Sequence, residues 1–286
     1  MSLNIKKFIC ALSLLTLSTA VQAYERVVST TGNASEVIAY LGLSKVLVGV
    51  DTTSTEPADV MEAIPKVGYR RSLSAEGILS LNPDLLILAP DAGPPNVLAQ
   101  ISVTKVPVIT LKDDKSIDGV VHDIELIANA LNAQEPAKVL LAKIRREELA
   151  IKQQQQAYKR KPKIAVLMDG STGRFTGLGK DTAGDGLVAL VGGDNVFAAQ
   201  FQGIKAISGE SLIAEPADMI IFSTFSKDKK VTELSPAKDY YPAIALSQAG
   251  KQDCIFRIDA SKALGFGPQV AQSAWQIAKA VNRCLP

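Results

Sequence analysis

Residues 72–88, SLSAEGILSLNPDLLIL, align without a gap on residues 206–222, AISGESLIAEPADMIIF. The polar residues that coincide are Ser74 with Ser208, Glu76 with Glu210, and Asp84 with Asp218. In each copy Ser-x-Glu precedes a short amphipathic segment, the pattern of a capped helix start. The aspartate then leads into an apolar run typical of a buried strand. The repeat predicts two lobes of one design, unless two unrelated helix–strand units resemble each other by chance.

Short apolar runs rich in β-branched residues alternate with amphipathic segments over the rest of the chain. The runs predicted to be buried strands are Val46–Val50, Leu85–Ala89, Val106–Leu111, Ile164–Met168, Met219–Phe222 and Ile255–Ile258. The segments predicted to be helical include Ser35–Leu41, Glu76–Leu81, Ile117–Leu131 and Gly184–Val191. This alternation predicts an α/β fold of two Rossmann-like lobes, each with a parallel sheet covered by helices.

One long helix is expected to connect the lobes. Residues 135–161 contain no glycine, and Pro136 suits the first turn of a helix. The apolar stripe of this segment consists of Ala137, Leu140, Leu141, Ile144 and Ile151. Its polar end, KQQQQAYKRK, could instead be a disordered hinge, but good helix propensity favours a rigid connection. We therefore divide the chain into an N-terminal lobe at 24–134, a connecting helix at 135–161 and a C-terminal lobe at 162–286.

The first 23 residues have the pattern of a secretory signal peptide. Lys6 and Lys7 form a positive n-region, Phe8–Leu17 is largely apolar, and small residues end at Ala23. The apolar run is shorter than the roughly 20 residues that a membrane-spanning helix needs, which disfavours a retained anchor. We expect cleavage after Ala23 and export of the remainder.

Export also determines how charge and cysteine content are interpreted. Loss of Lys6 and Lys7 reduces the formal net charge of +2 to zero, so the chain has no basic excess for binding nucleic acid. Only Cys254 and Cys284 follow the signal peptide. An even pair in an oxidising compartment favours a disulfide, with two free thiols as the alternative.

Sequence patterns of enzyme active sites are missing from the chain. The one histidine, His122, lies opposite the apolar side of its predicted helix and is expected to be solvated. No second histidine or cysteine cluster offers the usual spacing for zinc, and no serine is marked as a triad nucleophile. The glycine-rich residues 170–186 fit neither the P-loop nor the dinucleotide-binding pattern. A binding protein is therefore predicted, with an exported hydrolase as the rival.

Taken together, these features resemble the class III periplasmic solute-binding proteins of ABC importers for cobalamin, ferric siderophores and haem. Residues 67–87, VGYRRSLSAEGILSLNPDLLI, are similar to the haem-binding members, whose iron-ligating tyrosine shortly precedes such a segment. TAGDGLVALVGGDNVF at 182–197 extends the resemblance to the second lobe. The resemblance implies a monomeric periplasmic carrier that delivers haem to an ABC permease. A ferric siderophore or cobalamin is the alternative ligand.

The resemblance also implies roles for individual residues. Tyr69 is implied as the axial ligand of haem iron, because a phenolate is a hard donor suited to ferric iron. A nearby cation helps a phenol to ionise, and Arg71 is implied as that partner, with Arg70 facing a haem propionate or solvent. Met168 and Arg174 are weaker candidates for the opposite wall of the site.

Two further expectations follow from the resemblance. Some relatives supply a histidine from the second lobe, but residues 166–177 read VLMDGSTGRFTG, so we expect one haem that is five-coordinate or completed by water. Glu76 and Glu210 are implied as the two carboxylates that dock on permease arginines. Alternatively, both are only helix-start acids that interact favourably with the helix dipole.

Overall fold

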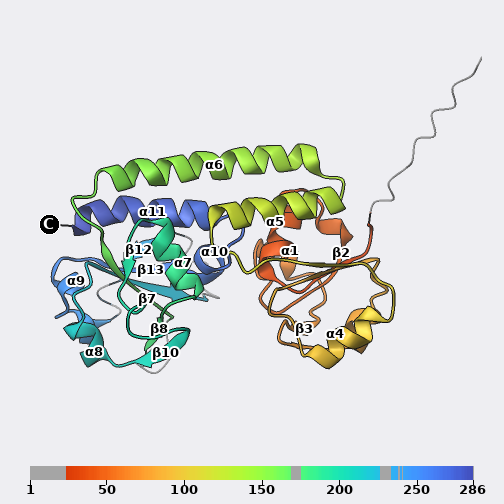
Figure 1. The fold of residues 1–286 in the computed structure, drawn as a ribbon, viewed down its shortest axis with the longest axis horizontal. Coiled ribbons are helices and arrows are strands. Elements are labelled where there is room, and N and C mark those ends of the chain that lie inside the picture. Colours follow the sequence, from red (N-terminus) through yellow and green to blue (C-terminus); the bar gives the residue numbers. More distant parts are fainter. Residues whose placement is uncertain (1–23, 169–174, 226–232, 238, 240, 286) are drawn as a thin grey trace, which may run out of the picture.

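The computed structural model describes residues 24–168, 175–225, 233–237, 239 and 241–285, which form two α/β lobes (Figure 1). The predicted signal peptide and its cleavage after Ala23 lie outside the described residues. Among the described residues, no helix is long and apolar enough to cross a membrane.

The N-terminal lobe contains a four-stranded parallel sheet with the order β2-β1-β5-β6. Its strands are β1 (Val27–Ser29), β2 (Leu47–Val50), β5 (Leu85–Leu88) and β6 (Val108–Thr110). A separate hairpin consists of β3 (Gly68–Tyr69) and β4 (Ser72–Leu73). The helices are α1 (Gly32–Tyr40), α2 (Ala58–Met61), α3 (Ala75–Leu79), α4 (Pro95–Ser102), α5 (Ile117–Ala130) and the 3₁₀ turn η1 (Ser44–Val46).

The C-terminal lobe contains a mixed sheet with the order β10-β8-β7-β11-β13-β12 and with β9 against β7. Mutually parallel strands are β7 (Lys163–Met168), β9 (Asp194–Asn195), β11 (Met219–Thr224) and β13 (Ile255–Asp259). Antiparallel strands are β8 (Phe175–Leu178), β10 (Ile204–Ile207) and β12 (Ser235–Pro236). Its helices are α7 (Ala183–Leu190), α8 (Gly209–Ala214), α9 (Gln248–Lys251), α10 (Ala260–Leu264), α11 (Val270–Cys284) and the 3₁₀ turn η3 (Pro242–Ile244).

The predicted α/β class is confirmed, and the six predicted strands correspond to β2, β5, β6, β7, β11 and β13. The parallel arrangement holds throughout the N-terminal sheet and at the centre of the C-terminal sheet. Sequence patterns missed β1, which is only three residues long, and the antiparallel strands β8, β10 and β12, which extend the second sheet.

The two copies of the sequence repeat make equivalent contacts. Ser74 Oγ accepts a hydrogen bond from Gly77 N at 3.2 Å, and Ser208 Oγ accepts one from Ser211 N at 3.1 Å. Both serines are therefore N-caps, of α3 and α8 respectively.

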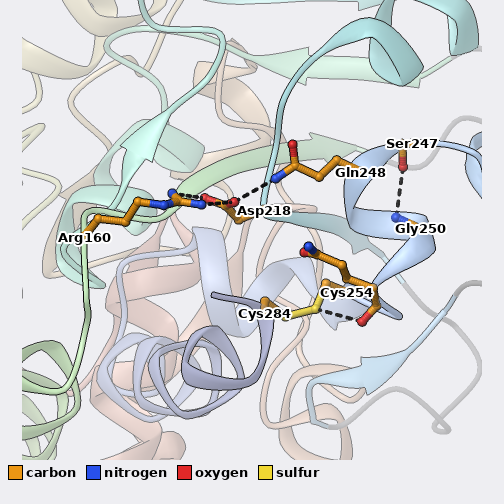
Figure 2. Close-up of a disulfide and its surroundings, with 8 residues drawn as sticks. Arg160, Asp218, Ser247, Gln248, Gly250, Cys254 and Cys284 are labelled. Carbon is orange, nitrogen blue, oxygen red and sulfur yellow. Dashed lines mark hydrogen bonds and ion pairs between the residues drawn. A yellow bond between two sulfur atoms is a disulfide. The ribbon is translucent and has the colours of Figure 1, made fainter. Parts of the chain in front are cut away.

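The repeated aspartates join each copy to the strand beside it. Asp84 accepts hydrogen bonds from Arg26 N at 2.9 Å and Glu25 N at 2.8 Å, just before β1. Asp218 accepts one from Lys163 N at 2.8 Å at the start of β7, and also pairs with Arg160 at 2.6 Å (Figure 2). In each lobe, the aspartate fixes the start of one central strand against the start of its neighbour.

Helix α6 (Gln134–Gln156) lies along one long side of the molecule, above α5 of the first lobe and α11 of the second (Figure 1). Ala137, Leu140 and Ile144 belong to the apolar core of the N-terminal lobe, whereas Ile151 belongs to that of the C-terminal lobe. The helix ends before residue 161, where the connecting segment was expected to end. Pro162 disfavours helical backbone at the residue before it.

The lobes also contact each other beneath α6. Phe266, Val270 and Ala271, around the start of α11, pack into the core of the N-terminal lobe. Beside them, Gln269 Nε2 donates a hydrogen bond to Glu36 Oε1 on α1 at 2.7 Å. The C-terminal segment therefore contributes to both lobes.

A disulfide joins Cys254 and Cys284, with a Cα–Cα distance of 5.8 Å (Figure 2). It connects the residue before β13 to the last residue of α11. Because the bond closes a loop with a sequence separation of 30, it restricts the unfolded chain.

The double variant Cys254→Ser/Cys284→Ser is expected to lower the free energy of unfolding by about 3–4 kcal/mol, because the loop-closure entropy is no longer removed from the unfolded state. Urea denaturation measures this, with reduced wild-type protein as the control. Two reactive thiols in unfolded, unreduced wild-type protein would contradict the disulfide.

Stability is also expected to depend on pH through Glu36, which is 4% exposed. Burial raises its pKa from 4.5 to about 7, although the hydrogen bond from Gln269 acts to lower it. The folded state thus favours the protonated form. Its stabilising contribution is complete below pH 4.5 and is lost as the pH rises through about 7.

Glu36→Gln removes this titration, so the variant is expected to exceed the wild type in unfolding free energy at pH 8 by about 3 kcal/mol and to match it near pH 4. Urea denaturation at both values tests the difference, with the exposed Glu125→Gln as the control. The same pH dependence in wild type and Glu36→Gln would show that Glu36 is not the group responsible.

Candidate ligand-binding site

The carboxyl ends of the parallel strands in the two sheets face each other. Thr55, which follows β2, and Ser261, which follows β13, approach to 3.0 Å between their hydroxyl oxygens. A cleft of about 380 Å³ lies between the lobes. It is lined by Asp113 and Lys115 from the first lobe and by Asp181, Thr182, Asp185 and Gly186 from the second. Ligands of α/β folds bind outside the carboxyl ends of the strands, so this edge is the expected binding side.

The β3–β4 hairpin carries the sequence motif to this edge. Val67 N bonds to Val50 O at 2.9 Å and Thr52 N bonds to Gly68 O at 3.0 Å, which fixes the hairpin beside the end of β2. Gly68 has a φ of +100°, a conformation that favours glycine. Tyr69 pairs with Ser72, so the two arginines between them form the turn. The Tyr69 side chain is 41% exposed, which leaves its phenol accessible.

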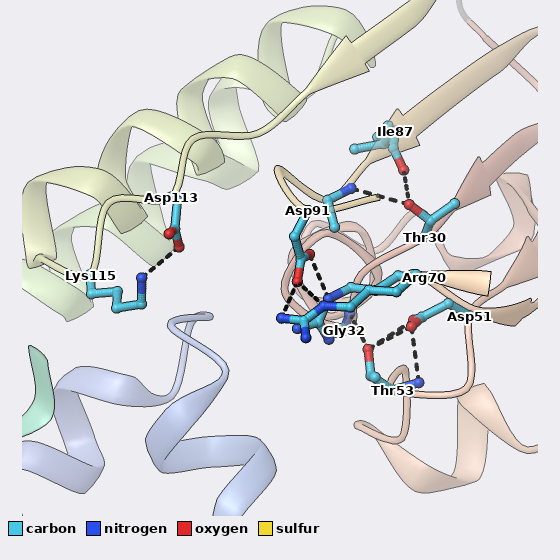
Figure 3. A network of polar contacts seen from close by, with 11 residues as sticks. Thr30, Gly32, Asp51, Thr53, Arg70, Ile87, Asp91, Asp113 and Lys115 are labelled. Atoms are coloured by element: carbon cyan, nitrogen blue, oxygen red, sulfur yellow. Dashed lines mark hydrogen bonds and ion pairs between the residues drawn. The ribbon is translucent and has the colours of Figure 1, made fainter. Parts of the chain in front are cut away.

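Arg70 and Arg71 share one carboxylate, that of Asp91 (Figure 3). Arg70 Nε bonds to Asp91 Oδ1 at 2.7 Å, while Arg71 bonds to Oδ2 through Nε at 2.7 Å and Nη2 at 2.6 Å. Burial tends to raise the pKa of Asp91, but hydrogen bonds from both arginines outweigh it and hold the pKa below its usual value. Asp91 therefore remains ionised at neutral pH.

The arginines differ from their expected arrangement around Tyr69. Arg71, the expected partner of Tyr69, pairs with Asp91. The guanidinium of Arg70 lies 5.5 Å from the centre of the Tyr69 ring, within range of a cation–π contact. Burial tends to lower the pKa of Arg70, but the hydrogen bond that Arg70 donates to Asp91 outweighs it, and the pKa is raised.

Buried polar contacts support the loops around the hairpin (Figure 3). Asp51 is fully buried and accepts hydrogen bonds from Thr53 Oγ1 at 2.8 Å and Ser54 Oγ at 2.8 Å. Thr30 Oγ1 accepts one from Ala89 N at 3.1 Å, at the start of the loop that carries Asp91. The Thr30–Ala89 bond joins the loops after β1 and β5, and Gly32 N joins the loop after β1 to the loop after β2 by donating to Thr53 Oγ1 at 3.3 Å.

The remaining predicted residues lie in different environments. Met168 ends β7 and packs against the core of its lobe, and Arg174 lies outside the described residues. Glu76 and Glu210 are exposed in the first turns of α3 and α8. His122 is exposed on α5.

Asp91 is the residue that the sequence interpretation missed. It lies 20 positions after Arg71, beyond the end of a correctly predicted strand. A polar residue at the carboxyl end of a parallel strand was the available signal, but its pairing with two arginines depends on how the hairpin folds back.

Residues 27–261 match the family described as periplasmic binding protein. The chain belongs to this family. Membership supports a periplasmic location and the binding of a solute.

Individual relatives differ in the ligands that their names record. The periplasmic heme-binding protein RhuT from Roseiflexus sp. RS-1 is 32% identical, with a TM-score of 0.76 over 91% of this chain and 98% of its own. The periplasmic heme-binding protein BhuT, solved with two hemes, is 27% identical, with a TM-score of 0.78 over 93% and 100%. A vitamin B12-binding protein of Yersinia pestis is 28% identical over 83% of this chain and 82% of its own.

Proposed function

We propose that this protein binds one haem in the cleft between its lobes and delivers it to an ABC permease, with Tyr69 as the iron ligand. The observation that carries the proposal is the exposed Tyr69 beside two arginines at the carboxyl edge of the first sheet. Similarity to periplasmic heme-binding proteins over about nine tenths of the chain supports the choice of ligand.

The chemistry of the hairpin suits a ferric porphyrin. A tyrosinate is an established axial ligand of haem iron, and ferric iron favours its ionisation. Arg70 lies against the Tyr69 ring, which places a positive charge beside the proposed iron ligand. The same arginines carry terminal N–H groups that can bind carboxylates, and haem carries two propionates.

A single histidine in the whole chain limits the ligation of the iron. His122 is on α5, one of the helices beside α6, and is not part of the hairpin or of the residues that line the cleft. We therefore expect haem that is five-coordinate or completed by water. We do not expect two stacked haems to bind in the cleft.

Cobalamin is the second candidate, because curated relatives are named vitamin B12-binding proteins. The Tyr69-Arg70-Arg71 turn favours haem over cobalamin, since cobalt in cobalamin is poorly suited to a phenolate. An anionic ferric siderophore would also suit the two arginines, and it is the ligand to test next if hemin does not bind.

Hemin titration of the apo-protein is expected to give a saturable Soret shift at one equivalent, with a tyrosinate charge-transfer band. Tyr69→Phe keeps the ring beside Arg70 but removes the oxygen donor. Tyr69→Phe is expected to lack the charge-transfer band and to bind hemin at least tenfold more weakly, because the iron–oxygen bond is missing.

Tyr40→Phe is the matched control for this titration, because Tyr40 is 43% exposed on α1, away from the hairpin. Unchanged hemin spectra in Tyr69→Phe would contradict tyrosine ligation. Tight binding of cyanocobalamin without any saturable response to hemin would identify the second candidate as the ligand.

The proposed delivery to a permease involves Glu76 and Glu210. Helix α8 and helix α4, which packs against α3, lie on the side of the molecule away from α6 (Figure 1). Both glutamates are exposed at equivalent points of the repeat. Two such carboxylates, one on each lobe, can orient the carrier on a permease with two related subunits.

Glu76→Ala/Glu210→Ala is expected to bind hemin like the wild type but to lose at least tenfold in the rate of haem uptake by vesicles that contain the cognate permease, because docking contacts are missing. Glu135→Ala, whose side chain is 82% exposed at the start of α6, is the control. A normal rate of haem uptake with the double variant would contradict the docking role of Glu76 and Glu210.

A further inference from the structure

The shared ion pair of Asp91 with Arg70 and Arg71 gives the hairpin a feature that the proposed haem site does not require. Both guanidinium groups bond to Asp91 through their Nε edges, and Arg71 also uses Nη2. Among the residues described in the structure, neither guanidinium group makes a further hydrogen bond or ion pair. Terminal N–H groups of both arginines are therefore available to a ligand while Asp91 stays in place.

The backbone around Asp91 is fixed independently of this carboxylate. Gly93 N bonds to Arg70 O at 2.9 Å, and Leu73 N bonds to Gly93 O at 2.9 Å. These bonds join the loop after β5 to the hairpin, with Asp91 between the strand and the bonded glycine. Removal of the Asp91 charge should therefore leave the loop and the hairpin attached to each other.

Side-chain exposure indicates which arginine depends most on Asp91. The Arg71 side chain is 60% exposed and that of Arg70 is 27% exposed. A long side chain with this exposure samples many rotamers unless a partner holds it, and ordering it on binding costs affinity. The bidentate contact of Arg71 with Oδ2 holds it in one orientation before any ligand arrives.

We propose that Asp91 is a positioning residue that holds Arg70 and Arg71 side by side with their terminal N–H groups free, so that the site selects a ligand with carboxylates along one edge. This inference rests on the proposed binding of haem. It assigns to Asp91 the preference of the site for the haem propionates. Asp91 acts through the arginines and does not contact the ligand itself.

A purely electrostatic role would have the opposite consequence. Removing a negative charge beside a binding site for carboxylates strengthens the attraction of an anionic ligand. Loss of a positioning residue weakens binding, because two free guanidinium groups must be ordered by the ligand. An asparagine side chain cannot replace the pairing, since it has a single acceptor oxygen and its amide would face the second guanidinium. The sign of the change in affinity therefore separates the two roles.

The experiment compares hemin with hemin dimethyl ester, which has the same iron and ring but no free carboxylates. For Asp91→Asn we expect hemin affinity to fall about tenfold and ester affinity to change less than twofold, with an unchanged melting temperature. Asp91→Glu, which restores an acceptor for both arginines, should recover part of the hemin affinity. Asp194→Asn is the matched control, because Asp194 forms an exposed ion pair with Lys161 at 3.0 Å, outside the hairpin and the residues that line the cleft.

The possible results separate the positioning role of Asp91 from the proposed function. Wild type that binds hemin, together with Asp91→Asn that binds it equally or more tightly, would overturn the positioning role and leave the proposed function intact. An equal loss for hemin and its ester would also overturn the role, since the effect would not involve the carboxylates. Wild type that fails to bind hemin would overturn both the proposed function and this role.

Discussion

Helix α6 is the constraint on which the rest of the structure depends. Its buried side packs Ile144 into the core of the first lobe and Ile151 into that of the second, within one continuous helix. Because both contacts are on a single rigid element, the separation of the lobes is set by helix geometry. The start of α11 strengthens this arrangement, since Phe266 and Val270 also enter the first core. This packing is therefore expected to restrict movement of the two lobes relative to each other.

The packing of α6 on both lobes brings the carboxyl ends of the parallel strands in the two sheets to face each other. The loops and the hairpin at these ends determine the chemistry of the site. Loops after β1, β2 and β5 are tied together by buried hydrogen bonds, and the β3–β4 hairpin is fixed against them. Tyr69 is thereby presented on a rigid turn instead of a free loop, which suits a metal donor. The arginines beside it are oriented by Asp91 before a ligand binds.

Sequence patterns were sufficient for the features that depend on local chemistry. Ser74 and Ser208 could be recognised as caps because capping acts within three residues, and apolar patterns identified α6 and most of the parallel strands. β1 contains only two apolar residues, Val27 and Val28, and so gave a weaker signal than the longer apolar run around β6. The antiparallel flank of the second sheet depends on pairing between distant segments. The partner of Arg71 could not be predicted either, because Asp91 reaches it only after the hairpin folds onto the next loop.

A crystal structure of the hemin-loaded protein, with anomalous diffraction at the iron edge, tests most directly the proposal that iron binds the phenolate of Tyr69 between the lobes. We expect one iron peak bonded to Tyr69 Oη, with the propionates near Arg70 and Arg71. An iron peak bonded to another side chain, or a haem outside the cleft, would contradict it.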